Sequence, residues 1–500
     1  QSISIKADDL PVNQWYIDSI AKTGVKILNR SKWLNAISID TTGYSNAMAK
    51  ILSYPFVVKS TPIGIKPASF SDLRKSKLSP DKNKFDNLES LVAISTPAGL
   101  NYGNSYNQVS MIGADCLHNN GYKGEGMVIA VIDAGFYKVD SLAAFDSLRA
   151  NNQILGTRDF VDGGTSVYED HSHGMMVLST MGGNLPGELI GTAPKAKYWL
   201  LRSEDAIPEN IIEEFDWVVA AEFADSVGAD VINSSLGYFT FDDSTQDHTY
   251  ADMNGKVALS SIGATRAARK GMAVVVSAGN SGPGCIGTPA DADSVLTIGA
   301  VDASGTLAGF SSRGPSYDKR VKPNVAAQGK GSVVASTKSG TITANGTSFS
   351  SPISAGAVAC LWQANPGKTN MQILKAVEKS ATQYNSPDSM LGYGIPNMCV
   401  ANMVLGGTDR SLFGQDKIIE SYPNPFETSV HLTFYSLEGQ TITIRLLDIR
   451  GRRITEETQR VNANSVNYFT IHDVENLESG MYILHVSSTG SNYYKKLIKN

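Results

Sequence analysis

Eight residues organise the interpretation of the whole chain: Asn345-Gly346-Thr347-Ser348-Phe349-Ser350-Ser351-Pro352. Gly346 allows a tight turn, and Pro352 is acceptable in a first helical turn, where backbone N–H groups lack intrahelical acceptors. The apolar residues that follow, from Ile353 to Leu361, recur at helical spacing. The stretch therefore predicts a turn followed by a helix that begins close to Ser348.

A serine at the start of a helix suits two different roles. The unpaired N–H groups there lie at the positive end of the helix dipole and can stabilise an oxyanion, which is the geometry that acyl transfer needs. The sequence Gly-Thr-Ser before a helix is also an ordinary N-cap. These eight residues alone leave both roles for Ser348 open.

The composition is that of a globular protein with several domains, since 500 residues with 42% hydrophobic and 18% charged residues allow two to four domains. Lys and Arg number 43 against 48 Asp and Glu, and the basic residues form no long block. We therefore expect no nucleic-acid partner. The longest apolar runs, such as 127–132 and 272–276, are far shorter than the roughly 20 residues that cross a bilayer. We expect no transmembrane segment and interpret these runs as buried strands.

The chain begins at Gln1 rather than Met. The usual reason is removal of a secretory signal peptide, and the alternative is that the protein was expressed without its first residues. The four cysteines are too scattered for a zinc cluster and too few for a disulfide scaffold: Cys116, Cys285, Cys360 and Cys399. Cys360 and Cys399 both fall in predicted helical stretches, where they either pair or remain buried thiols.

The sequence pattern divides the chain into four parts. Residues 1–60 predict a small α+β unit with helices at 12–21 and 44–52 and strands at 25–28, 34–39 and 56–59. So short a piece has a thin core and gains stability by docking on a larger partner. Residues 61–98 mix prolines with lysines and arginines, which is typical of an exposed, protease-sensitive linker.

Residues 99–407 alternate short apolar runs with amphipathic helical patterns. The strand-like runs are 127–132, 198–201, 231–233, 273–276 and 295–298, and the helical ones include 211–223 and 257–269. This alternation predicts an α/β domain with a mostly parallel sheet, helices on both faces, and ligands beyond the carboxyl ends of the strands.

Residues 408–500 change to a two-residue alternation. Apolar residues alternate with polar ones at 430–434, 442–446 and 482–486, and glycines separate these segments. The pattern predicts a small all-β antiparallel sandwich.

A serine nucleophile needs a general base, and the base needs an orienting acid. His171 and His173 open an apolar helical pattern and are the best placed of the seven histidines. Residues two apart do not share a helix face, so only one of them can serve as the base. Taken alone, the pair also fits a loop or a partial metal site.

Two predicted strands end in polar residues that can complete such a site. Asp133 ends the run Val128-Ile129-Ala130-Val131-Ile132, where a carboxylate can hold an imidazole in one tautomer or merely cap the next turn. Asn280 follows Val274-Val275-Val276-Ser277-Ala278-Gly279, where its amide can donate to an oxyanion or only shape a turn.

The order and context of Asp133, His173, Asn280 and Ser348 closely resemble the subtilisin-like serine proteases over roughly residues 100–405. The resemblance rests on three motifs: Val131-Ile132-Asp133-Ala134-Gly135, His173-Gly174-Met175-Met176-Val177 and Gly346-Thr347-Ser348-Phe349-Ser350-Ser351-Pro352. Met175 and Met176 stand where most members carry Thr and His. Only His173 is followed by glycine, so the resemblance favours it over His171 as the base.

The resemblance implies a role for each matching residue. Asp133 would orient His173, His173 would activate Ser348, and Asn280 would stabilise the oxyanion. The segment Ser235-Leu236-Gly237 would pair with the substrate backbone, and with Ser277-Ala278-Gly279 it would wall the pocket for the residue before the scissile bond. Such pairing favours extended peptide substrates.

The flanking parts resemble companions of this domain. Residues 1–60 look like an inhibitory propeptide. The segments Tyr422-Pro423-Asn424-Pro425-Phe426, Leu447-Asp448-Ile449-Arg450-Gly451-Arg452, Ser479-Gly480-Met481-Tyr482 and Lys495-Lys496-Leu497-Ile498-Lys499 resemble the C-terminal sorting domain of bacterial type IX secretion. The implied partners are the chain's own propeptide and the secretion machinery, and the implied location is outside the bacterial cell or on its surface.

The sequence thus predicts a secreted serine endopeptidase that acts on peptide or protein substrates and is made as a zymogen. Its main rival is a catalytically silent, subtilase-like surface protein that binds peptides or a partner. An esterase with the same triad is disfavoured because the chain lacks the Gly-x-Ser-x-Gly elbow. No cofactor is expected. Some subtilases carry structural calcium, but no Asp-rich loop identifies a metal site here.

Overall fold

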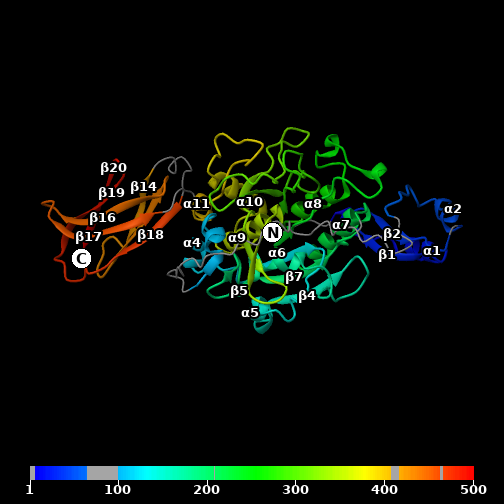
Figure 1. Cartoon of the computed structure of the whole chain (residues 1–500), viewed down its shortest axis with the longest axis horizontal. Coiled ribbons are helices and arrows are strands. Elements are labelled where there is room, and N and C mark those ends of the chain that lie inside the picture. The colour runs from blue at the N-terminus through cyan, green and yellow to red at the C-terminus, as the bar shows by residue number, and fades with distance from the viewer. Residues whose placement is uncertain (1–5, 45, 65–99, 208, 407–415, 462–464) are drawn as a thin grey trace. The chain divides into compact units, whose positions relative to one another are not determined.

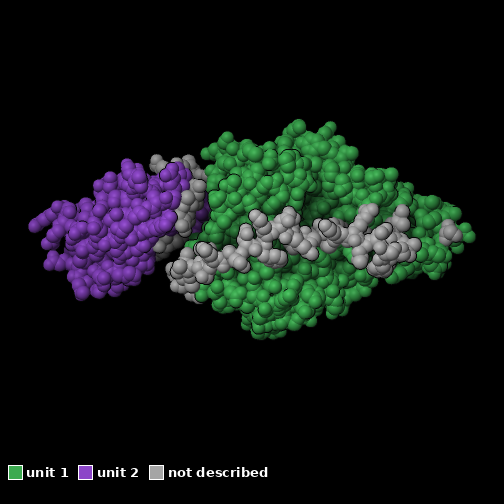
Figure 2. All heavy atoms as spheres, in the orientation of Figure 1, with its two compact units in different colours: residues 1–396 green, residues 397–500 purple. Residues whose placement is uncertain are grey.

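The computed structural model describes residues 6–44, 46–64, 100–207, 209–406, 416–461 and 465–500. It divides the chain into two compact units, residues 1–396 and residues 397–500 (Figure 2). The predicted linker at 61–98 lies almost wholly outside the described residues.

The first unit is built on a sheet of seven parallel strands (Figure 1). In spatial order these are β11 (Val325–Gln328), β10 (Leu296–Val301), β9 (Ala273–Ser277), β8 (Val231–Ser234), β3 (Val128–Asp133), β7 (Lys197–Arg202) and β4 (Ile154–Asp159). Most of their residues are buried, as expected for a parallel sheet covered on both faces. The predicted α/β class is confirmed.

Two pairs of helices cover the two faces of this sheet. One pair is α7 (Ile212–Ser226) and α8 (Leu259–Arg269), which share an apolar core with alternate strand residues such as Ile132 and Val274. The other pair is α6 (His173–Gly182) and α9 (Thr347–Gln363), which pack together and contact the sheet. Asp133 ends β3 with its side chain toward α6, so the predicted site lies at the carboxyl ends of the strands.

The remaining elements of this part of the chain surround the sheet. The helices are α3 (Tyr106–Ser110), α4 (Ala114–Asn119), α5 (Asp146–Ala150) and α10 (Asn370–Ser380), with short 3₁₀ turns η2 (Gly103–Ser105), η3 (Ala143–Phe145), η4 (Ser244–Gln246) and η5 (Tyr250–Asp252). Two hairpins pair β5 (Asn184–Leu185) with β6 (Leu189–Ile190) and β12 (Ser332–Ala335) with β13 (Thr341–Ala344).

The N-terminal part of the first unit contains the predicted α+β elements. They are η1 (Ala7–Asp9), α1 (Gln14–Ala21), β1 (Lys26–Ser31), β2 (Ala36–Asp40) and α2 (Ala47–Leu52), with β1 and β2 antiparallel. Their own core is small, consisting of Ile20, Val25, Ala47 and Ile51 with partly buried neighbours.

The strand predicted at 56–59 is wrong, because residues 54–56 form a turn and 57–60 have no regular structure. Phe56 stacks on Tyr16 of α1 with ring centroids 4.3 Å apart, and Val58 is 98% exposed. The apolar run therefore packs one aromatic ring on a helix instead of entering a sheet.

The N-terminal part docks on carboxylates of α7, among which Glu222 makes the most contacts. Glu222 accepts hydrogen bonds from Ser31 Oγ, from Lys32 N at 2.9 Å and from Trp33 N at 3.1 Å. Trp33 is itself buried in the core that contains α7. The predicted gain from docking on a larger partner thus has a structural basis.

The second unit is an antiparallel β-sandwich, as predicted. One sheet contains β14 (Lys417–Tyr422), β15 (Val430–Ser436) and β18 (Ser465–Ile471), and the other contains β17 (Arg453–Val461), β16 (Gln440–Asp448), β19 (Gly480–Ser488) and β20 (Ser491–Lys499). Helix α11 (Met398–Leu405) precedes them. Alternate residues such as Leu432, Ile444 and Leu484 form a separate core.

Candidate active site

Ser348 is the second residue of α9 and is 7% exposed. Gly346 caps the helix with φ 153°, a backbone conformation that residues with a side chain rarely adopt, which explains the glycine here. The first N–H groups of a helix have no carbonyl within the helix to bind. The backbone N–H of Ser348 is one of these groups.

Pro352 lies deeper in α9 than the sequence predicted, because the helix begins at Thr347 and includes Pro352 as its sixth residue. Proline has no N–H to give the carbonyl four residues earlier, which is that of Ser348. Ser235 Oγ donates to that carbonyl instead, at 2.9 Å. The proline therefore frees the Ser348 carbonyl, and the end of β8 binds it.

The same contact continues into a buried polar chain. Asn233 Nδ2 donates to Ser235 Oγ at 3.2 Å, and Ser351 Oγ donates to Asn233 Oδ1 at 2.9 Å. The hydroxyl of Ser348 in turn donates to the carbonyl of Ser235 at 3.4 Å. The first turn of α9 is thus fastened to the carboxyl end of β8 at several points.

Asp133 and His173 meet directly. His173 Nδ1 lies 2.7 Å from Asp133 Oδ1, which also accepts from Ala134 N at 2.8 Å. Asp133 is fully buried, and its Oδ2 has no hydrogen-bond partner among the described residues. The ring of Phe349, next to Ser348 in the chain, lies 6.2 Å from that of His173 between centroids. The structure therefore brings the three predicted segments to one place.

Gly174 is what lets α6 approach β3 so closely. A Cβ at this position would lie 2.5 Å from Gly135 O and 2.9 Å from Asp133 Cβ, closer than real contacts allow. The glycine that follows His173 is therefore a packing requirement of the Asp133–His173 contact.

The pKa values of the two neighbouring histidines shift in opposite directions. Burial lowers the pKa of His173, but the charge and hydrogen bond of Asp133 raise it, and the net pKa lies above the ordinary value. Burial lowers the pKa of His171, and the neighbouring His173 lowers it further. His171 Nδ1 accepts from His173 N at 3.2 Å. His173 thus has the buried carboxylate partner that a general base needs.

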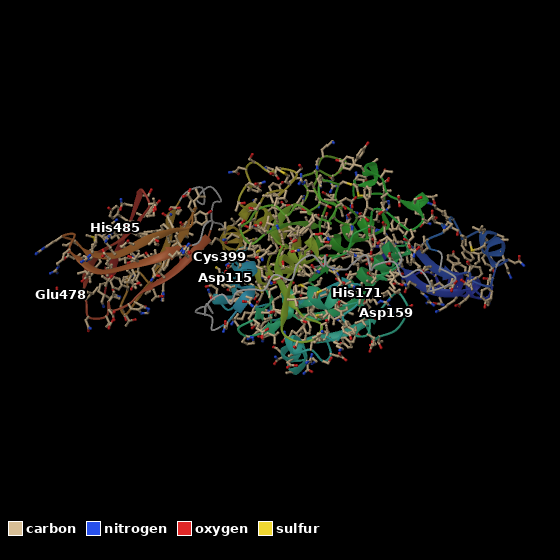
Figure 3. The ribbon with its side chains drawn as sticks, viewed as in Figure 1. Asp115, Asp159, His171, Cys399, Glu478 and His485 are labelled. Carbon is tan, nitrogen blue, oxygen red and sulfur yellow. The ribbon has the colours of Figure 1, made fainter. Side chains whose placement is uncertain are left out.

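Arg202 braces this region and is a residue that sequence reasoning missed. It ends β7 beside Asp133 and pairs with Asp159 at 2.8 Å, Asp162 at 2.8 Å and Asp170 at 3.5 Å. Arg202 therefore joins the end of β4, at Asp159, to the segment before α6 that contains Asp170 and His171. Figure 3 labels Asp159 and His171. The sequence feature that could have revealed Arg202 is its position as a charged residue at the end of an apolar strand.

Asn280 is oriented by the residue before the serine. Its Oδ1 accepts from Thr347 N at 2.9 Å and from Thr347 Oγ1 at 3.0 Å. Its Nδ2 lies 3.7 Å from the point where a Cβ on Gly346 would lie. Because the oxygen is held by two donors, the amide nitrogen is the group available to donate beside α9.

The two predicted substrate segments lie on either side of this point. Ser235 and Leu236 are buried, and among the described residues the backbone of Gly237 makes no hydrogen bond within the fold. In the other segment, Ser277 and Ala278 are buried, and Gly279 N donates to Thr347 Oγ1 at 3.2 Å. Both segments thus contact the start of α9, and Gly237 offers an unpaired edge.

The described end of the N-terminal part reaches the same side of the domain. Ile63 O accepts from Ile212 N at 2.8 Å, and Pro62 O accepts from Gln246 Nε2 at 3.3 Å. The start of α7 therefore binds the backbone of the described end of the N-terminal part.

Three carboxylates form a compact group among the residues described: Glu204, Glu209 and Glu213 have oxygens within 4.8 Å of one another. Oxygen ligands of this kind suit calcium. Glu213 already accepts from Asp205 N and Asn210 N, and Glu204 from Tyr238 Oη. An acidic group alone does not establish a metal site, so these carboxylates identify no calcium site.

Cys360 is a free, fully buried thiol, so the pairing with Cys399 that we considered is wrong. Its sulfur lies 3.2 Å from Thr192 O, and burial raises its pKa far above the ordinary value. Cys360 is therefore a packing residue.

Three family profiles match separate parts of the chain. The "Subtilase family" matches residues 124–394, the "Peptidase S8 propeptide domain, Bacteroidota" matches residues 1–82, and the "Secretion system C-terminal sorting domain" matches residues 420–500. No helix of the described residues is long and apolar enough to cross a membrane.

Curated relatives agree with the central match. The chain is 32% identical to subtilisin E of Bacillus subtilis (strain 168) over 301 residues, covering 59% of this chain and 70% of that protein. It is 31% identical to subtilisin of Bacillus pumilus over 301 residues, covering 59% of this chain and 97% of that protein. Among solved structures, the prenylagaramide maturation protease PagA is 24% identical, with a TM-score of 0.46, and the match covers 59% of this chain and 99% of that one.

The flanking matches give the central domain its context, since a propeptide precedes it and a sorting domain follows it. They indicate a bacterial protein that is secreted or held at the cell surface, with its own propeptide and the secretion machinery as partners. The chain belongs to the subtilase family and is a serine peptidase of the subtilisin type.

Proposed function

We propose that the protein is a secreted endopeptidase that cleaves peptide bonds through an acyl-enzyme on Ser348 and is made as a zymogen. The observation that carries this proposal is the 2.7 Å contact between His173 Nδ1 and Asp133 Oδ1 beside the start of α9. That contact leaves Nε2 of the imidazole to take a proton.

The first half of the reaction forms the acyl-enzyme. The hydroxyl of Ser348 turns from the Ser235 carbonyl toward His173, gives its proton to Nε2 and attacks the substrate carbonyl carbon. Asp133 stabilises the imidazolium, and Asn280 Nδ2 with the Ser348 N–H binds the tetrahedral oxyanion. His173 then protonates the leaving amine, the C–N bond breaks, and the acyl group remains on Ser348.

The second half repeats these steps with water. His173 takes a proton from water, the resulting hydroxide attacks the ester carbon, and the proton returns to Ser348 Oγ as the ester bond breaks. Both halves use the same oxyanion donors, so losing one donor slows both.

Two features support an extended peptide as the substrate. The backbone of Gly237, which makes no hydrogen bond among the described residues, can take up hydrogen bonds of the kind that add a strand to a sheet. The start of α7 already holds the backbone carbonyl of Ile63. The inhibitory role that we propose for the N-terminal part is supported by the propeptide match to residues 1–82.

The rival function is a silent surface protein that binds peptides without cutting them. Digestion of an unbiased peptide library separates the two, with Ser348→Ala as the control. We expect cleavage products from the processed wild-type protein and none from Ser348→Ala. If the wild-type protein and Ser348→Ala are both folded and neither gives cleavage products, the binding function would be favoured.

A further inference from the structure

The loop at residues 238–253 and the start of α7 both bind the segment 62–64. The loop contributes Gln246 Nε2, which donates to Pro62 O at 3.3 Å, and α7 contributes Ile212 N, which donates to Ile63 O at 2.8 Å. A Cβ added to Gly64 would lie 3.7 Å from side-chain atoms of Asn210 and Ile212. The loop and the start of α7 therefore both bind residues 62–64, and we call the surface formed by Gln246, Asn210 and Ile212 the groove.

One buried carboxylate ties the loop and α7 together. Glu214, in the first turn of α7, is fully buried, and its Oε1 lies 2.5 Å from His248 Nε2 of the loop. The same carboxylate accepts from Thr288 Oγ1 and from Ser260 N, each at 3.2 Å. Glu214 therefore joins α7 to His248 of the loop, to Thr288 and to Ser260 at the start of α8.

The loop is directly continuous with the substrate edge. Tyr238 follows Gly237 and pairs through its backbone with Thr288, with N···O distances of 2.8 and 3.0 Å. The loop therefore begins directly at the predicted substrate edge.

We propose that the His248–Glu214 ion pair fixes the width of this groove, so that His248 is a positioning residue whose protonation controls how tightly an extended peptide is held. The inference deepens the proposed peptidase function and rests on it for the identity of the substrate.

The charges around His248 come from three elements. Burial lowers its pKa, but the hydrogen bond and charge of Glu214 on α7 raise it, as do Asp252 of η5 and Asp291 before β10. The ring of Phe241 packs edge-on against it, with centroids 5.5 Å apart. The net pKa lies above the ordinary imidazole value of about 6.5. The His248 charge is therefore favoured below this raised pKa, and the ion pair is lost as the pH rises through it.

The two histidines then have opposite requirements. His173 acts as a base only when neutral, so its titration gives the rising limb of a pH profile. His248 holds the groove only when charged, so its titration gives a falling limb. Because the groove binds substrate without touching the reacting atoms, the falling limb should appear as a rise in KM rather than as a loss of kcat.

The direct test measures hydrogen exchange of the Ile212 amide in the full chain carrying Ser348→Ala, between pH 6 and pH 9. Protection, corrected for the intrinsic exchange rate, should fall by about 10-fold with rising pH, the size expected for a hydrogen bond between charged groups. His248→Gln keeps a donor without a charge and should make protection independent of pH. His248→Ala should give low protection throughout, and His485→Gln, a histidine of the other unit, should behave as the parent.

The second test measures kinetics with the processed enzyme. KM for a peptide that extends six residues before the cut should rise at high pH, while KM for a two-residue substrate should not. His248→Gln should abolish that difference. Flat protection of Ile212 in the parent, or the same pH dependence in His248→Gln, would overturn the inference. Should His248→Gln fail to fold, the parent and His485→Gln still decide the matter.

These outcomes separate the inference from the proposed function. The exchange measurement needs no catalysis, so it can succeed in a protein without peptidase activity. Failure of the peptidase function would instead appear as the absence of any cleavage that depends on Ser348.

Discussion

Asn280 gives the sharpest prediction at the scale of single residues. Its amide nitrogen is available because Thr347 holds its oxygen, and its donor matters mainly once the oxyanion forms. Asn280→Ala should therefore lower kcat by about 10²–10³ with little change in KM. Steady-state kinetics on one peptide substrate checks this, and an effect confined to KM would reject the oxyanion role.

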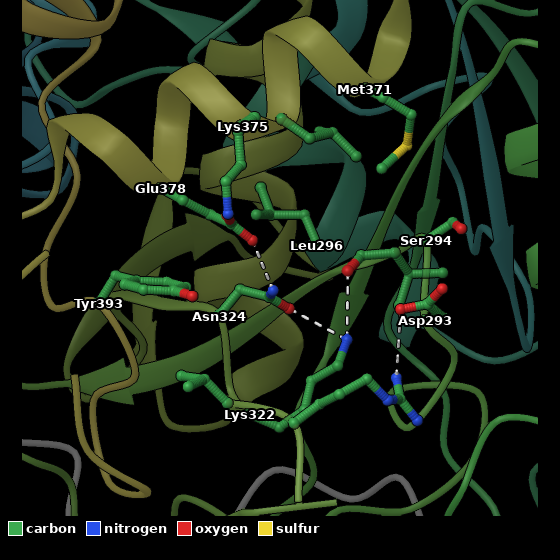
Figure 4. A pocket seen from close by; sticks show the side chains of 13 residues that line it. Asp293, Ser294, Leu296, Lys322, Asn324, Met371, Lys375, Glu378 and Tyr393 are labelled. Atoms are coloured by element: carbon green, nitrogen blue, oxygen red, sulfur yellow. Dashed lines mark hydrogen bonds and ion pairs between the residues drawn. The ribbon is translucent and has the colours of Figure 1, made fainter. Parts of the chain in front are cut away.

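The buried amine of Lys322 leads to a prediction about how the free energy of unfolding depends on pH. It lines a cavity of about 280 Å³ with residues of α10, and Figure 4 shows it beside Asn324 and Glu378. Its Nζ is fully buried and lies 2.8–3.2 Å from Val295 O, Thr297 Oγ1 and Asn324 Oδ1. Burial, together with the charge of the nearby Arg320, lowers its pKa to about 7 against the charges of Asp291 and Glu378.

The sign follows from proton binding. Between pH 7 and the ordinary lysine value of about 10.4, the unfolded chain binds a proton at Lys322 that the folded chain does not, so this group makes stability increase with pH. Its slope is at most about 1.4 kcal/mol per pH unit. In a Ser348→Ala background, the urea midpoint should rise less between pH 7 and pH 9 for Lys322→Met than for the parent. Parallel changes in both proteins would contradict the buried neutral amine.

The candidate site shows which residues a sequence can reveal. Asp133, His173, Asn280 and Ser348 stand in short motifs whose chemistry restricts the residue type, and the structure brings their segments together as predicted; their roles remain predictions. The bond from Ser235 to the Ser348 carbonyl could not be predicted. This bond forms because α9 begins before Pro352, so that the proline leaves the Ser348 carbonyl without a helical donor, and the exact start of α9 cannot be read from the sequence.

Helix α7 gives a prediction at the scale of elements. Glu222 takes three hydrogen bonds from Ser31, Lys32 and Trp33, so Glu222→Ala leaves buried donors without an acceptor. Protection of the Lys32 and Trp33 amides should fall by about 10- to 100-fold, measured by hydrogen exchange in the Ser348→Ala chain.

Asp225→Asn is the matched control on the same helix. Asp225 lies 3.7 Å from Lys32, and both side chains are about a quarter exposed. Partly exposed ion pairs contribute little, so this change should leave protection nearly unaltered. Equal effects of the two variants would show that Glu222 is not the main attachment.

The elements also show where sequence patterns are sufficient. Long apolar runs predicted β3, β8 and β9 because strands buried on both faces consist of little else. Strand β4 was not predicted, since Ile154–Asp159 mixes exposed and polar residues at the edge of the sheet. The opposite error at 56–59 arose because an apolar run alone does not reveal that Phe56 packs on Tyr16.

At the scale of the whole molecule, the C-terminal unit should be dispensable for catalysis. Its sandwich has a separate core that includes Leu432 and Leu484, so it has its own source of stability. Deleting residues from Thr408 onward should leave peptidase activity largely intact and stop export. Cell fractionation and a peptidase assay on the truncated protein check the two halves of this prediction, and a truncated protein that still reaches the exterior would contradict the sorting role.

The domain boundaries of the whole chain remain predictions. The compact units divide at 396–397, before the predicted boundary at 407–408, and the sorting-domain match begins at residue 420. A composition change marks where a new pattern starts. It does not show that α11, between these points, groups with the second unit.

The central claim is that Ser348 is a nucleophile activated by His173, and labelling with a fluorophosphonate tests it most directly. The processed wild-type protein should gain one adduct, mapped by mass spectrometry to the peptide that contains Ser348. His171→Ala should label normally, whereas His173→Ala should label at a rate lower by several orders of magnitude, because the serine hydroxyl stays protonated without its base. A folded, processed protein that gains no adduct at Ser348, or that loses labelling equally with His171→Ala, would contradict this account.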